Sequence, residues 1–522
     1  MSTATSPAAP LSAYAIQVDP RDNVAVARVP VPRGTQVQVG PAVVEVLDDV
    51  TPGHRFALHA IPEGEFVRQY GQPIGTSKGV VPGALIARAN MSNEVPVVRE
   101  LDPHLSNPAP DFVPEAQRAT FMGYHRPDGR VGIRNWVLIV PTSMCAAHEA
   151  VQIATVAEFT LFDKAKYPNV DGVVAIPHNK GCGCSDGSNI EVMLRTLAAY
   201  AEHPNVGGVV FIGLGCEKTN LTVMEQYLSD QHRPMNKPVA RIGIQEAGGT
   251  QGSVKRGLEA VEAMLPVVNA ITRQPAPISA LSMGVKCGGS DGFSGLSANP
   301  ALGRAADELI RQGGTVLITE VPEFCGAEHI LASRAKDAET GRAVYEMVDW
   351  YKDYAAKFGT VLNENPSPGN VAGGLLNITI KSLGAIAKAG TLRVEGVVGY
   401  AEQPTGRGLY LMQGPGYDQE STPGLIASGA QLVVFTTGRG TTIGNAIAPV
   451  LKLASNNTMY ERMKSDIDLS AGDIIDGTAS IDQVGLDVFA YVCKVASGEI
   501  LGKSEETKHR EFQVWAEQSV SL

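Results

Sequence analysis

Three runs in the middle of the chain are apolar from end to end, and they constrain the fold more than any other feature. They are WVLIVP (136–141), GVVAIP (172–177) and GGVVFIG (207–213). Two stretches with helical periodicity separate them, AHEAVQIATVAEFTLF (147–162) and SNIEVMLRTLAAYAEH (188–203). Strands that are apolar at every position are typical of parallel sheets covered by helices on both faces. The alternation therefore predicts βαβ units in this part of the chain.

A second block of the same kind begins near Ala280, after the proline-containing stretch ITRQPAPIS. Its expected strands are LSMGVK, GTVLITE and QLVVFTT, and its expected helices include NPALGRAADELIRQG and SIDQVGLDVFAYVCKVASG. Ahead of both blocks, residues 14–89 hold short alternating runs (AIQV, NVAVARV, VVEVL and ALIARA) cut by PRG, TPG, PEG and VPG turns. Such alternation is typical of a small β-rich domain.

The predicted fold class is therefore α/β, with a small β-rich N-terminal domain and then two α/β domains with largely parallel sheets. A chain of 522 residues is long enough for about three domains. The expected divisions are a disordered Ser/Ala/Pro tail at 1–11, the β-rich domain at 12–90, a proline-rich linker at 91–118, and α/β domains at 119–275 and 276–522.

Charge and hydropathy exclude several classes of partner. The formal net charge of -11 and the pI near 5.5 argue against a phosphate-binding footprint, so we expect no nucleic-acid partner. No apolar run approaches the roughly 18 residues that span a bilayer, so we expect no membrane partner. The first residues, MSTATSPAAPLSA, lack the basic and apolar regions of a signal peptide, which predicts a cytoplasmic location.

Four of the seven cysteines share one setting, because each follows an apolar run and stands at a turn rich in small residues. They are Cys145, Cys182, Cys216 and Cys287. Strand ends are where α/β sheets place their chemistry, so this set of thiols predicts a metal or cluster site. The spacing is not that of a zinc finger, since a single residue separates Cys182 from Cys184.

Two further candidates lie beside these cysteines. His178 precedes the glycine turn of Cys182 and could act as an acid, a base or a ligand, although a hydrogen-bonded structural histidine is the alternative. Lys218 follows Cys216 and could bind a substrate carboxylate, against the alternative of a surface ion pair. In EVPEFCGAEH, either Glu320 or Glu323 could serve as a general base, with helix capping as the alternative.

Glycine-rich loops supply the expected substrate-binding residues. Ser290 and Asp291, in CGGSDGFSG, could form an anion nest or bind sugar hydroxyls, although a simple turn uses the same residues. Arg439 stands at the glycine-rich end of the run QLVVFTT and could clamp a carboxylate in a bidentate manner, or merely stabilise its loop. Lys381 follows the loop ENPSPGN and is a further candidate for substrate binding.

Taken in order, these motifs resemble the altronate/galactarate dehydratase family over nearly the whole chain. The resemblance rests on YPNVDGVV, IGLGCEK, CGGSDGFSGLSANPALG, NPSPGN and FTTGRGT. The N-terminal segments DNVAVA and TPGHRFAL resemble the SAF domain that this family carries ahead of its catalytic body. The turn around Cys182 and the segment TTGRGTTIGN depart from the family pattern, so the resemblance leaves the substrate open.

The resemblance implies a hydro-lyase that removes water from an aldonate or aldarate to give a 2-keto-3-deoxy acid, with dependence on iron or another divalent metal. It also implies that Cys145, Cys182, Cys216 and Cys287 are the family's cysteine positions, and that His54 and His178 match family positions. We expect His54, His178, Lys218 and Glu320 in catalysis, and Ser290, Asp291, Lys381 and Arg439 in substrate binding.

Thiolate ligands favour iron, as Fe²⁺ or as an iron–sulfur cluster, over magnesium. Three cysteines that leave one iron position open would suit removal of a hydroxide. Two alternatives stay open: a sulfo-lyase that releases sulfite from a sulfolactate-like acid, and a non-enzymatic thiol-based metal or redox sensor. The expected partner is a small sugar acid, and the expected assembly is a homo-oligomer, with a dimer as the commonest closed form.

Overall fold

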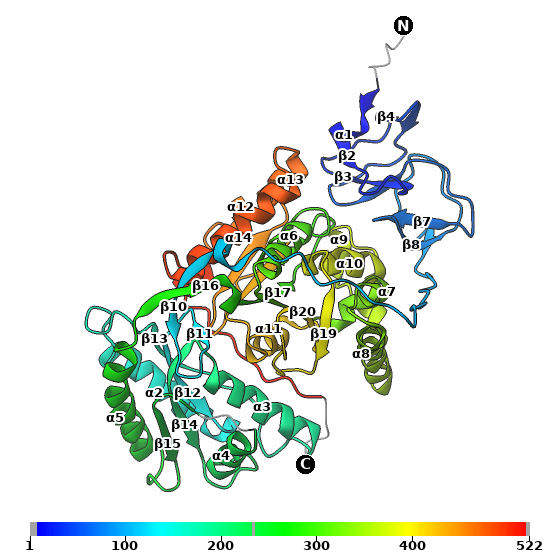
Figure 1. The fold of residues 1–522 in the computed structure, drawn as a ribbon. Coiled ribbons are helices and arrows are strands. Elements are labelled where there is room, and N and C mark those ends of the chain that lie inside the picture. Colours follow the sequence, from blue (N-terminus) through cyan, green and yellow to red (C-terminus); the bar gives the residue numbers. More distant parts are fainter. Residues whose placement is uncertain (1–7, 232–234, 518–522) are drawn as a thin grey trace.

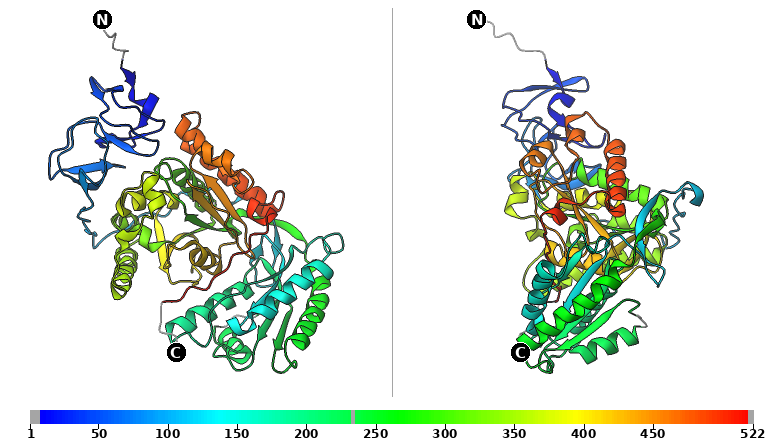
Figure 2. Two further views of the ribbon diagram at one scale, coloured as in Figure 1. Left: turned by 180° about the vertical axis from the view of Figure 1, so that it is seen from behind. Right: turned by 90° about the vertical axis from the view of Figure 1, so that its left-hand side faces the viewer.

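A computed structural model describes residues 8–231 and 235–517 and confirms the predicted fold class. The chain forms a β-rich N-terminal part and two α/β parts, and the C-terminal α/β part lies between the other two (Figures 1 and 2). The N-terminal part contains three small sheets, β1-β4-β5, β2-β3-β6 and β7-β8-β9. Their strands are β1 (Ala9–Pro10), β2 (Ala15–Ile16), β3 (Val24–Ala27), β4 (Gln36–Val39), β5 (Ala42–Glu45), β6 (Arg55–Ala57), β7 (Phe66–Gln69), β8 (Gln72–Ser77) and β9 (Met91–Ser92).

Two details of the N-terminal part differ from expectation. Residues 1–7 of the expected tail lie outside the described residues, but β1 pairs in parallel with β4 and α1 (Leu11–Tyr14) follows it. The ordered chain thus begins before residue 12, because backbone pairing holds a segment that lacks a hydrophobic side-chain pattern. The expectation of a strand at ALIARA (84–89) is wrong, since only Leu85 pairs there, in a bridge with Phe56.

The proline-rich segment that follows β9 runs along the C-terminal α/β part. Asn107 donates its backbone N–H to the carbonyl of Lys336, and Val113 donates to that of Arg311. Arg99 forms ion pairs with Glu328 and Asp349, at 2.9 and 2.7 Å. These contacts attach the segment to the C-terminal α/β part, so it is not a free linker.

The first α/β part is built on a parallel sheet of order β13-β12-β14-β15. Its strands are β12 (Trp136–Pro141), β13 (Gly172–Ala175), β14 (Val206–Gly213) and β15 (Val239–Gly243). Helices α2 (Ala147–Thr160) and α5 (Thr250–Asn269) cover one face, and α3 (Ser188–Glu202) and α4 (Leu221–Asp230) cover the other. A small antiparallel sheet of β10 (Thr120–His125), β11 (Val131–Gly132) and β16 (Arg273–Pro277) lies beside it. The βαβ units expected from the apolar runs are confirmed.

The C-terminal part carries a seven-stranded parallel sheet of order β19-β20-β18-β17-β21-β22-β23. Its strands are β17 (Ser282–Cys287), β18 (Thr315–Ile318), β19 (Val394–Val398), β20 (Gly408–Met412), β21 (Leu432–Thr437), β22 (Val450–Ala454) and β23 (Leu469–Ser470). Helices α6 (Ala298–Arg311) and α14 (Ile481–Ser497) pack on one face. Helix α11 (Asp418–Ala427) packs on the other face and also against α3.

One hydrophobic cluster joins the two α/β parts. It contains residues of β12 and α3 from one part and residues of α11 and β21 from the other. The last described segment returns to this junction, where Phe512 packs on Tyr200 and Trp515 packs on Trp350 and Tyr400. Such a shared core holds the loops of the two sheets in a fixed relation. Among the described residues, no helix is both long and apolar enough to cross a bilayer.

Candidate active site

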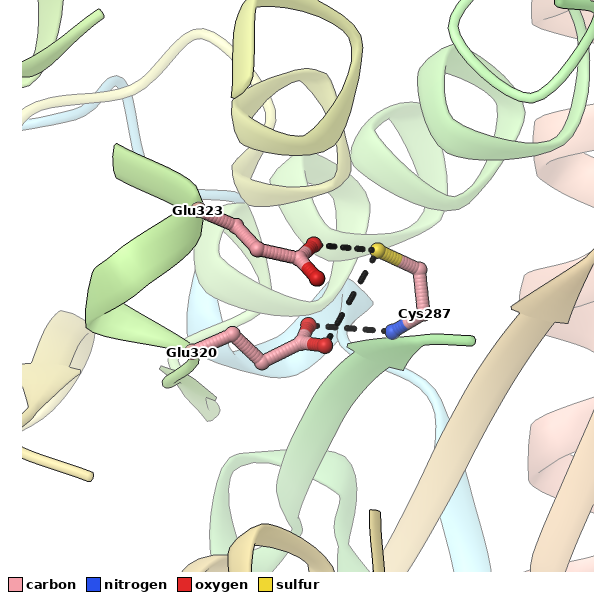
Figure 3. Close-up of side chains that lie close together, drawn as sticks. All are labelled: Cys287, Glu320 and Glu323. Carbon is pink, nitrogen blue, oxygen red and sulfur yellow. Dashed lines mark hydrogen bonds between the residues drawn. The ribbon is translucent and has the colours of Figure 1, made fainter. Parts of the chain in front are cut away.

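The carboxyl ends of the neighbouring strands β17 and β18 bring a thiol and two carboxylates together. Cys287 ends β17, Glu320 follows β18, and Glu323 lies in the 3-10 helix η4 (Val321–Phe324) that comes next. Figure 3 shows the three side chains pointing at one another. The sulfur of Cys287 lies 3.3 Å from Oε2 of Glu323, and its backbone N–H donates to Oε2 of Glu320 at 3.1 Å.

The backbone at Glu320 is left-handed, with φ of 74°. This conformation is unfavourable for a residue with a Cβ and costs on the order of 1 kcal/mol or more. Glu320 is fully buried, and its carboxylate faces back toward the end of β17. Strain at a buried carboxylate points to a functional constraint at this position.

Three lysines surround these acids. Lys286 lies 2.5 Å from Oε1 of Glu320, and Lys388, in the 3-10 helix η6 (Ile386–Ala389), lies 2.9 Å from Oε2. Lys381, in α10 (Ile378–Ala385), lies 2.7 Å from Oε1 of Glu323. Lys388 also lies 3.1 Å from the sulfur of Cys287. In this buried group, each carboxylate therefore lies next to at least one lysine ammonium group.

Burial and charge shift the pKa values in this group in opposite directions. Burial alone lowers the pKa of Lys286, but Asp418, Glu320 and Glu323 more than offset this, so the pKa is raised. Burial raises the pKa of Glu323, but the three lysines hold it at about 2. Burial, with the neighbouring carboxylates, raises the pKa of the Cys287 thiol to about 12. At neutral pH the lysines are charged, Glu323 is ionised and Cys287 is a neutral thiol.

The outer side of this group is formed by Asp418 at the start of α11. Lys286 donates to Oδ1 of Asp418 at 2.7 Å, and the side chain of Asp418 is 34% exposed while that of Lys286 is fully buried. Burial raises the pKa of Glu420, and the charge of Lys180 opposes this shift. Lys180 belongs to the loop of Cys182, so the first α/β part lies near this outer side.

The segment after residue 364 connects the lysine group to the N-terminal domain. Asn365 accepts from Lys381 at 3.0 Å. In α9 (Pro368–Ala372), Asn370 donates to the carbonyl of Ser290 at 2.7 Å, and the carbonyl of Ala372 lies 3.2 Å from Nε2 of His54. The turn before His54 packs tightly here, since a Cβ on Gly53 would lie 2.8 Å from the carbonyl oxygen of Gly373.

The hydrogen bond of His54 determines its tautomer. A carbonyl oxygen can only accept, so Nε2 of His54 carries the proton. In the neutral ring, Nδ1 then holds a lone pair. His54 is half-buried at the junction of the two domains and can accept a proton at this atom.

Ser290, Asp291 and Arg439 lie on adjoining loops. Oδ1 of Asp291 accepts from the hydroxyls of Ser294 and Ser455 at 3.0 and 2.9 Å, so this carboxylate holds its loop together. The backbone N–H of Arg439 donates to the carbonyl of Gly289 at 2.8 Å, and its side chain is exposed. Five predicted residues thus lie at the end of β17 or on the loops after β17, β18 and β21: Cys287, Ser290, Asp291, Glu320 and Arg439. A sixth, Lys381, lies on α10.

The other three predicted metal ligands belong to the first α/β part. Cys145, Cys182 and Cys216 follow β12, β13 and β14, which are neighbours in one sheet, and all three are exposed. Met144 donates its N–H to the carbonyl of Lys180 at 2.7 Å, which joins two of these loops. Within the described chain, the group of three metal-ligating atoms lying within 4.8 Å of one another is Cys287, Glu320 and Glu323, and it includes none of these three cysteines.

His178 and Lys218 lie beside these cysteines with defined partners. Nε2 of His178 donates to the carbonyl of Pro141 at 3.0 Å, and Nδ1 accepts from the N–H of Lys180 at 3.2 Å. Burial lowers the pKa of His178 to about 4, so the ring is neutral and both nitrogens hold the loop. Lys218 lies 3.0 Å from Asp186 and donates to the carbonyl of Cys184.

Comparison with known proteins covers most of the chain. Residues 13–94 match the model described as Altronate/galactarate dehydratase SAF domain, 123–269 that of D-galactarate dehydratase/Altronate hydrolase, second domain, and 278–520 that of D-galactarate/Altronate dehydratase, C-terminal. Altronate dehydratase from Bacillus subtilis is 34% identical over 96% of this chain and 98% of its own length. The chain belongs to the altronate/galactarate dehydratase family.

Other relatives of this chain have names other than altronate dehydratase. Galactarate dehydratase (L-threo-forming) from Escherichia coli is 36% identical, over 94% of each chain. (2R)-Sulfolactate sulfo-lyase subunit beta from Chromohalobacter salexigens is 32% identical over 76% of this chain and 97% of its own length. A solved carbon monoxide dehydrogenase from Thermococcus sp. AM4 aligns with a TM-score of only 0.17 at 10% identity, over 72% of this chain and 61% of that one.

The charges around Cys287 in this dehydratase do not fit a divalent metal ion. Both carboxylates are neutralised by lysines at 2.5 to 2.9 Å, and the thiol faces Lys388. A cation there would displace three ammonium groups and would need a thiolate whose pKa is about 12. The exposed thiols of Cys145, Cys182 and Cys216 are soft donors of the kind that iron prefers, but within the described chain they belong to no group of three ligating atoms lying within 4.8 Å of one another.

Sequence reasoning missed Lys286, Lys388 and Asp418. Lys286 is a single charge inside the apolar strand β17, and Lys388 lies in a buried stretch, GAIAKAG. A lysine enclosed by apolar residues is rare without a partner. That anomaly is the signal in the sequence that could have identified the two lysines; nothing comparable marks Asp418.

Proposed function

We propose that this protein removes water from a sugar acid, an aldonate or an aldarate, to give a 2-keto-3-deoxy acid. The observation that carries the proposal is the group of three charged lysines around Glu320 and Glu323 at the carboxyl ends of parallel strands. Members named altronate and galactarate dehydratase match nearly the whole chain. Family membership favours an enzyme over the thiol-based sensor.

The lysines suit the first step of such an elimination. A proton α to a carboxylate is very weakly acidic, and its removal leaves an enediolate with added negative charge. Ammonium groups fixed before the reaction stabilise that charge without reorganisation. Lys381 is the best placed of the three, because it is 9% exposed while Lys286 and Lys388 are fully enclosed. Lys381 also donates to Asn365, in the segment whose Asn370 binds the carbonyl of Ser290.

His54 is the base that the geometry favours. Glu320 contacts two lysines, and Glu323, with its pKa near 2, is a weak base. Nδ1 of His54 has its lone pair free of the bond to Ala372, and an imidazole is the side chain that most often serves as a general base. We assign proton removal to His54 and assign Glu320 to holding Lys286 and Lys388 in place.

The expected cofactor is iron, as Fe²⁺ or an iron–sulfur cluster, and the residues that would hold it are Cys145, Cys182 and Cys216. When bound, iron supplies a Lewis acid for the departing hydroxyl oxygen. His178 positions two of the loops that carry these cysteines through its bonds to Pro141 and Lys180. The charge of Lys180 acts on Glu420, so the loop of Cys182 lies near the start of α11.

Turnover tests this proposal directly. The protein would be purified without oxygen, supplied with ferrous iron, and incubated with altronate, galactarate, related sugar acids and sulfolactate. Formation of a 2-keto acid from a sugar acid is the expected result. Absence of product from every sugar acid would contradict the proposed reaction.

The oligomeric state is a separate prediction. We expect a homodimer, and light scattering would measure the mass of the assembly.

A second candidate function keeps the scaffold and changes the leaving group. The observation that favours it is the similarity to the sulfo-lyase subunit, which this chain covers almost completely. Removal of the α-proton is common to both reactions, so His54 and the lysines would serve either. Release of sulfite from sulfolactate, with no 2-keto acid from sugar acids, would identify the sulfo-lyase.

A further inference from the structure

The N-terminal domain contains a buried arginine without a counterion. Arg55 lies on β6 and is 1% exposed. Its Nε, Nη1 and Nη2 all lack a hydrogen-bond partner among the described residues. Burial lowers the pKa of this guanidinium to about 10, so it remains charged at neutral pH.

An isolated charge of this kind is costly. Removing a charged group from water costs several kcal/mol even after the protein relaxes, unless an opposite charge or several hydrogen bonds replace the water. The buried Arg134 pairs with Glu505 at 2.6 Å, and the buried Arg126 donates through Nε and Nη2 to backbone carbonyls, whereas every side-chain nitrogen of Arg55 lacks a partner among the described residues. The exception at Arg55 therefore indicates an anionic group that occupies this place in the working protein.

The register of the small sheet shows where Arg55 points. Arg55 pairs with Val26 of β3 in the antiparallel ladder, so the two side chains share one face. Val26 packs against Phe293, Leu296 and Ile475 of the C-terminal part. Arg55 thus faces the interface between the domains, on the side of the loop that carries Ser290 and Asp291.

Tyr70 lies beside Arg55 and cannot neutralise it. Burial raises the pKa of Tyr70 to about 12, with the charge of Arg55 opposing the shift, so the phenol keeps its proton. Tyr70 has a left-handed backbone with φ of 60°, and Asp22 holds that turn by accepting from Gly71 at 2.7 Å. Its ring reaches across the interface, where its hydroxyl packs against Gly295 and Gly384.

Two hydroxyls on the opposite side of the interface also lack partners. Ser290 Oγ and Ser382 Oγ are buried and make no hydrogen bond to the described residues. Ser290 is two residues from Gly292, which abuts Gly53, and Ser382 is two residues from Gly384, which abuts Tyr70. One unpaired cation and two unpaired hydroxyls thus lie on the segments that join the two domains.

We propose that Arg55 binds a carboxylate of the substrate and that Ser290 and Ser382 recognise oxygen atoms of the same ligand. The inference rests on the proposed function, which supplies a polyhydroxy acid as ligand. A guanidinium presents paired N–H donors that match a carboxylate. The SAF domain then contributes substrate recognition to the site, and the anion removes the cost of the buried charge.

The test compares Arg55→Met and Arg55→Lys with Arg68→Met. Arg68 is a matched control in the same domain, on β7, where its guanidinium lies over the ring of Phe66. We expect Arg55→Met to melt at or above the wild-type temperature without ligand, because the variant lacks an unpaired buried charge. Its KM for the sugar acid should rise at least 100-fold, Arg55→Lys should recover part of that loss, and Arg68→Met should match the wild type.

Two results would overturn the assignment: a KM for Arg55→Met within twofold of wild type, or a variant that fails to fold without ligand, which would make Arg55 a structural residue. A binding measurement tests the Arg55 site independently of the proposed reaction. If the wild type turns over no sugar acid, melting curves with galactarate and with sulfolactate decide the matter. A ligand-induced rise in wild type that disappears in Arg55→Met supports the carboxylate site, and an equal rise or no rise in both proteins refutes it.

Discussion

Lys286 and Glu320 lie at the ends of adjacent parallel strands, with 2.5 Å between Nζ and Oε1, and both side chains are fully buried. The pair is the centre of a charge group that also includes Cys287, Glu323, Lys381 and Lys388. Buried ion pairs of this kind contribute less to stability than they cost when broken. Their retention at a strained residue is consistent with catalysis.

Lys286→Met should destabilise the protein by about 3–5 kcal/mol, because it leaves buried carboxylate charge with fewer partners. Urea unfolding followed by circular dichroism measures the change. The double variant Lys286→Met/Glu320→Gln should recover part of the loss, since the orphaned charge is gone. If the double variant were less stable by the full sum of the single changes, the two groups would not be coupled.

The thiols should react in two classes. In metal-free protein at pH 8, iodoacetamide should alkylate the exposed Cys145, Cys182 and Cys216, whereas Cys287 is buried and has a pKa of about 12. Mass spectrometry of peptides gives the labelling rate at each site. Labelling of Cys287 as fast as Cys216 in the folded protein would contradict the enclosed site.

His178 should make stability depend on pH in a defined window. Its pKa falls from an ordinary 6.5 to about 4 on folding, so the unfolded chain binds the proton more readily. The contribution of the neutral His178 ring to the free energy of unfolding is complete above pH 6.5. This contribution, about 3 kcal/mol, is lost as the pH falls toward 4. The difference in unfolding free energy between wild type and His178→Gln should narrow over this range, and a constant difference would argue against a buried neutral ring.

His54→Gln should lower kcat by about 10²–10⁴-fold if His54 removes the α-proton. The half-buried side chain has one hydrogen bond, to Ala372, so the melting temperature should change little. Exchange of the substrate α-proton with solvent deuterium, followed by NMR, isolates this step. His104→Gln, an exposed histidine, is the control. Undiminished exchange in His54→Gln would assign the base to another residue.

The iron content of alanine variants should distinguish Cys287 from the other three cysteines of the predicted metal set. Alanine at Cys145, Cys182 or Cys216 should reduce bound iron, while Cys287→Ala should keep the wild-type content, because three lysines occupy the surroundings of that thiol. Metal analysis of anaerobically purified protein gives the result. Loss of iron in Cys287→Ala alone would place the metal at the strand end of β17.

The apolar runs determined the sheets. Strands β12, β13, β14, β17, β18 and β21 lie where largely apolar runs predicted them, because a strand covered on both faces favours apolar residues along its length. Strands β15, β19, β20, β22 and β23, and β1 in the expected tail, were not predicted. Their pairing depends on neighbouring strands, which a local pattern does not report.

The sequence by itself determined the class of fold, the positions of the cysteines at strand ends and the resemblance that led to the family. Only the tertiary structure decided that Cys287 belongs to a lysine-rich group while Cys145, Cys182 and Cys216 lie on another sheet. It also decided that Arg55 faces the domain interface without a counterion. The physical reason is that charge pairing acts through space: Lys286 and Asp418 are 132 residues apart, and no local pattern records which distant charge neutralises a buried one.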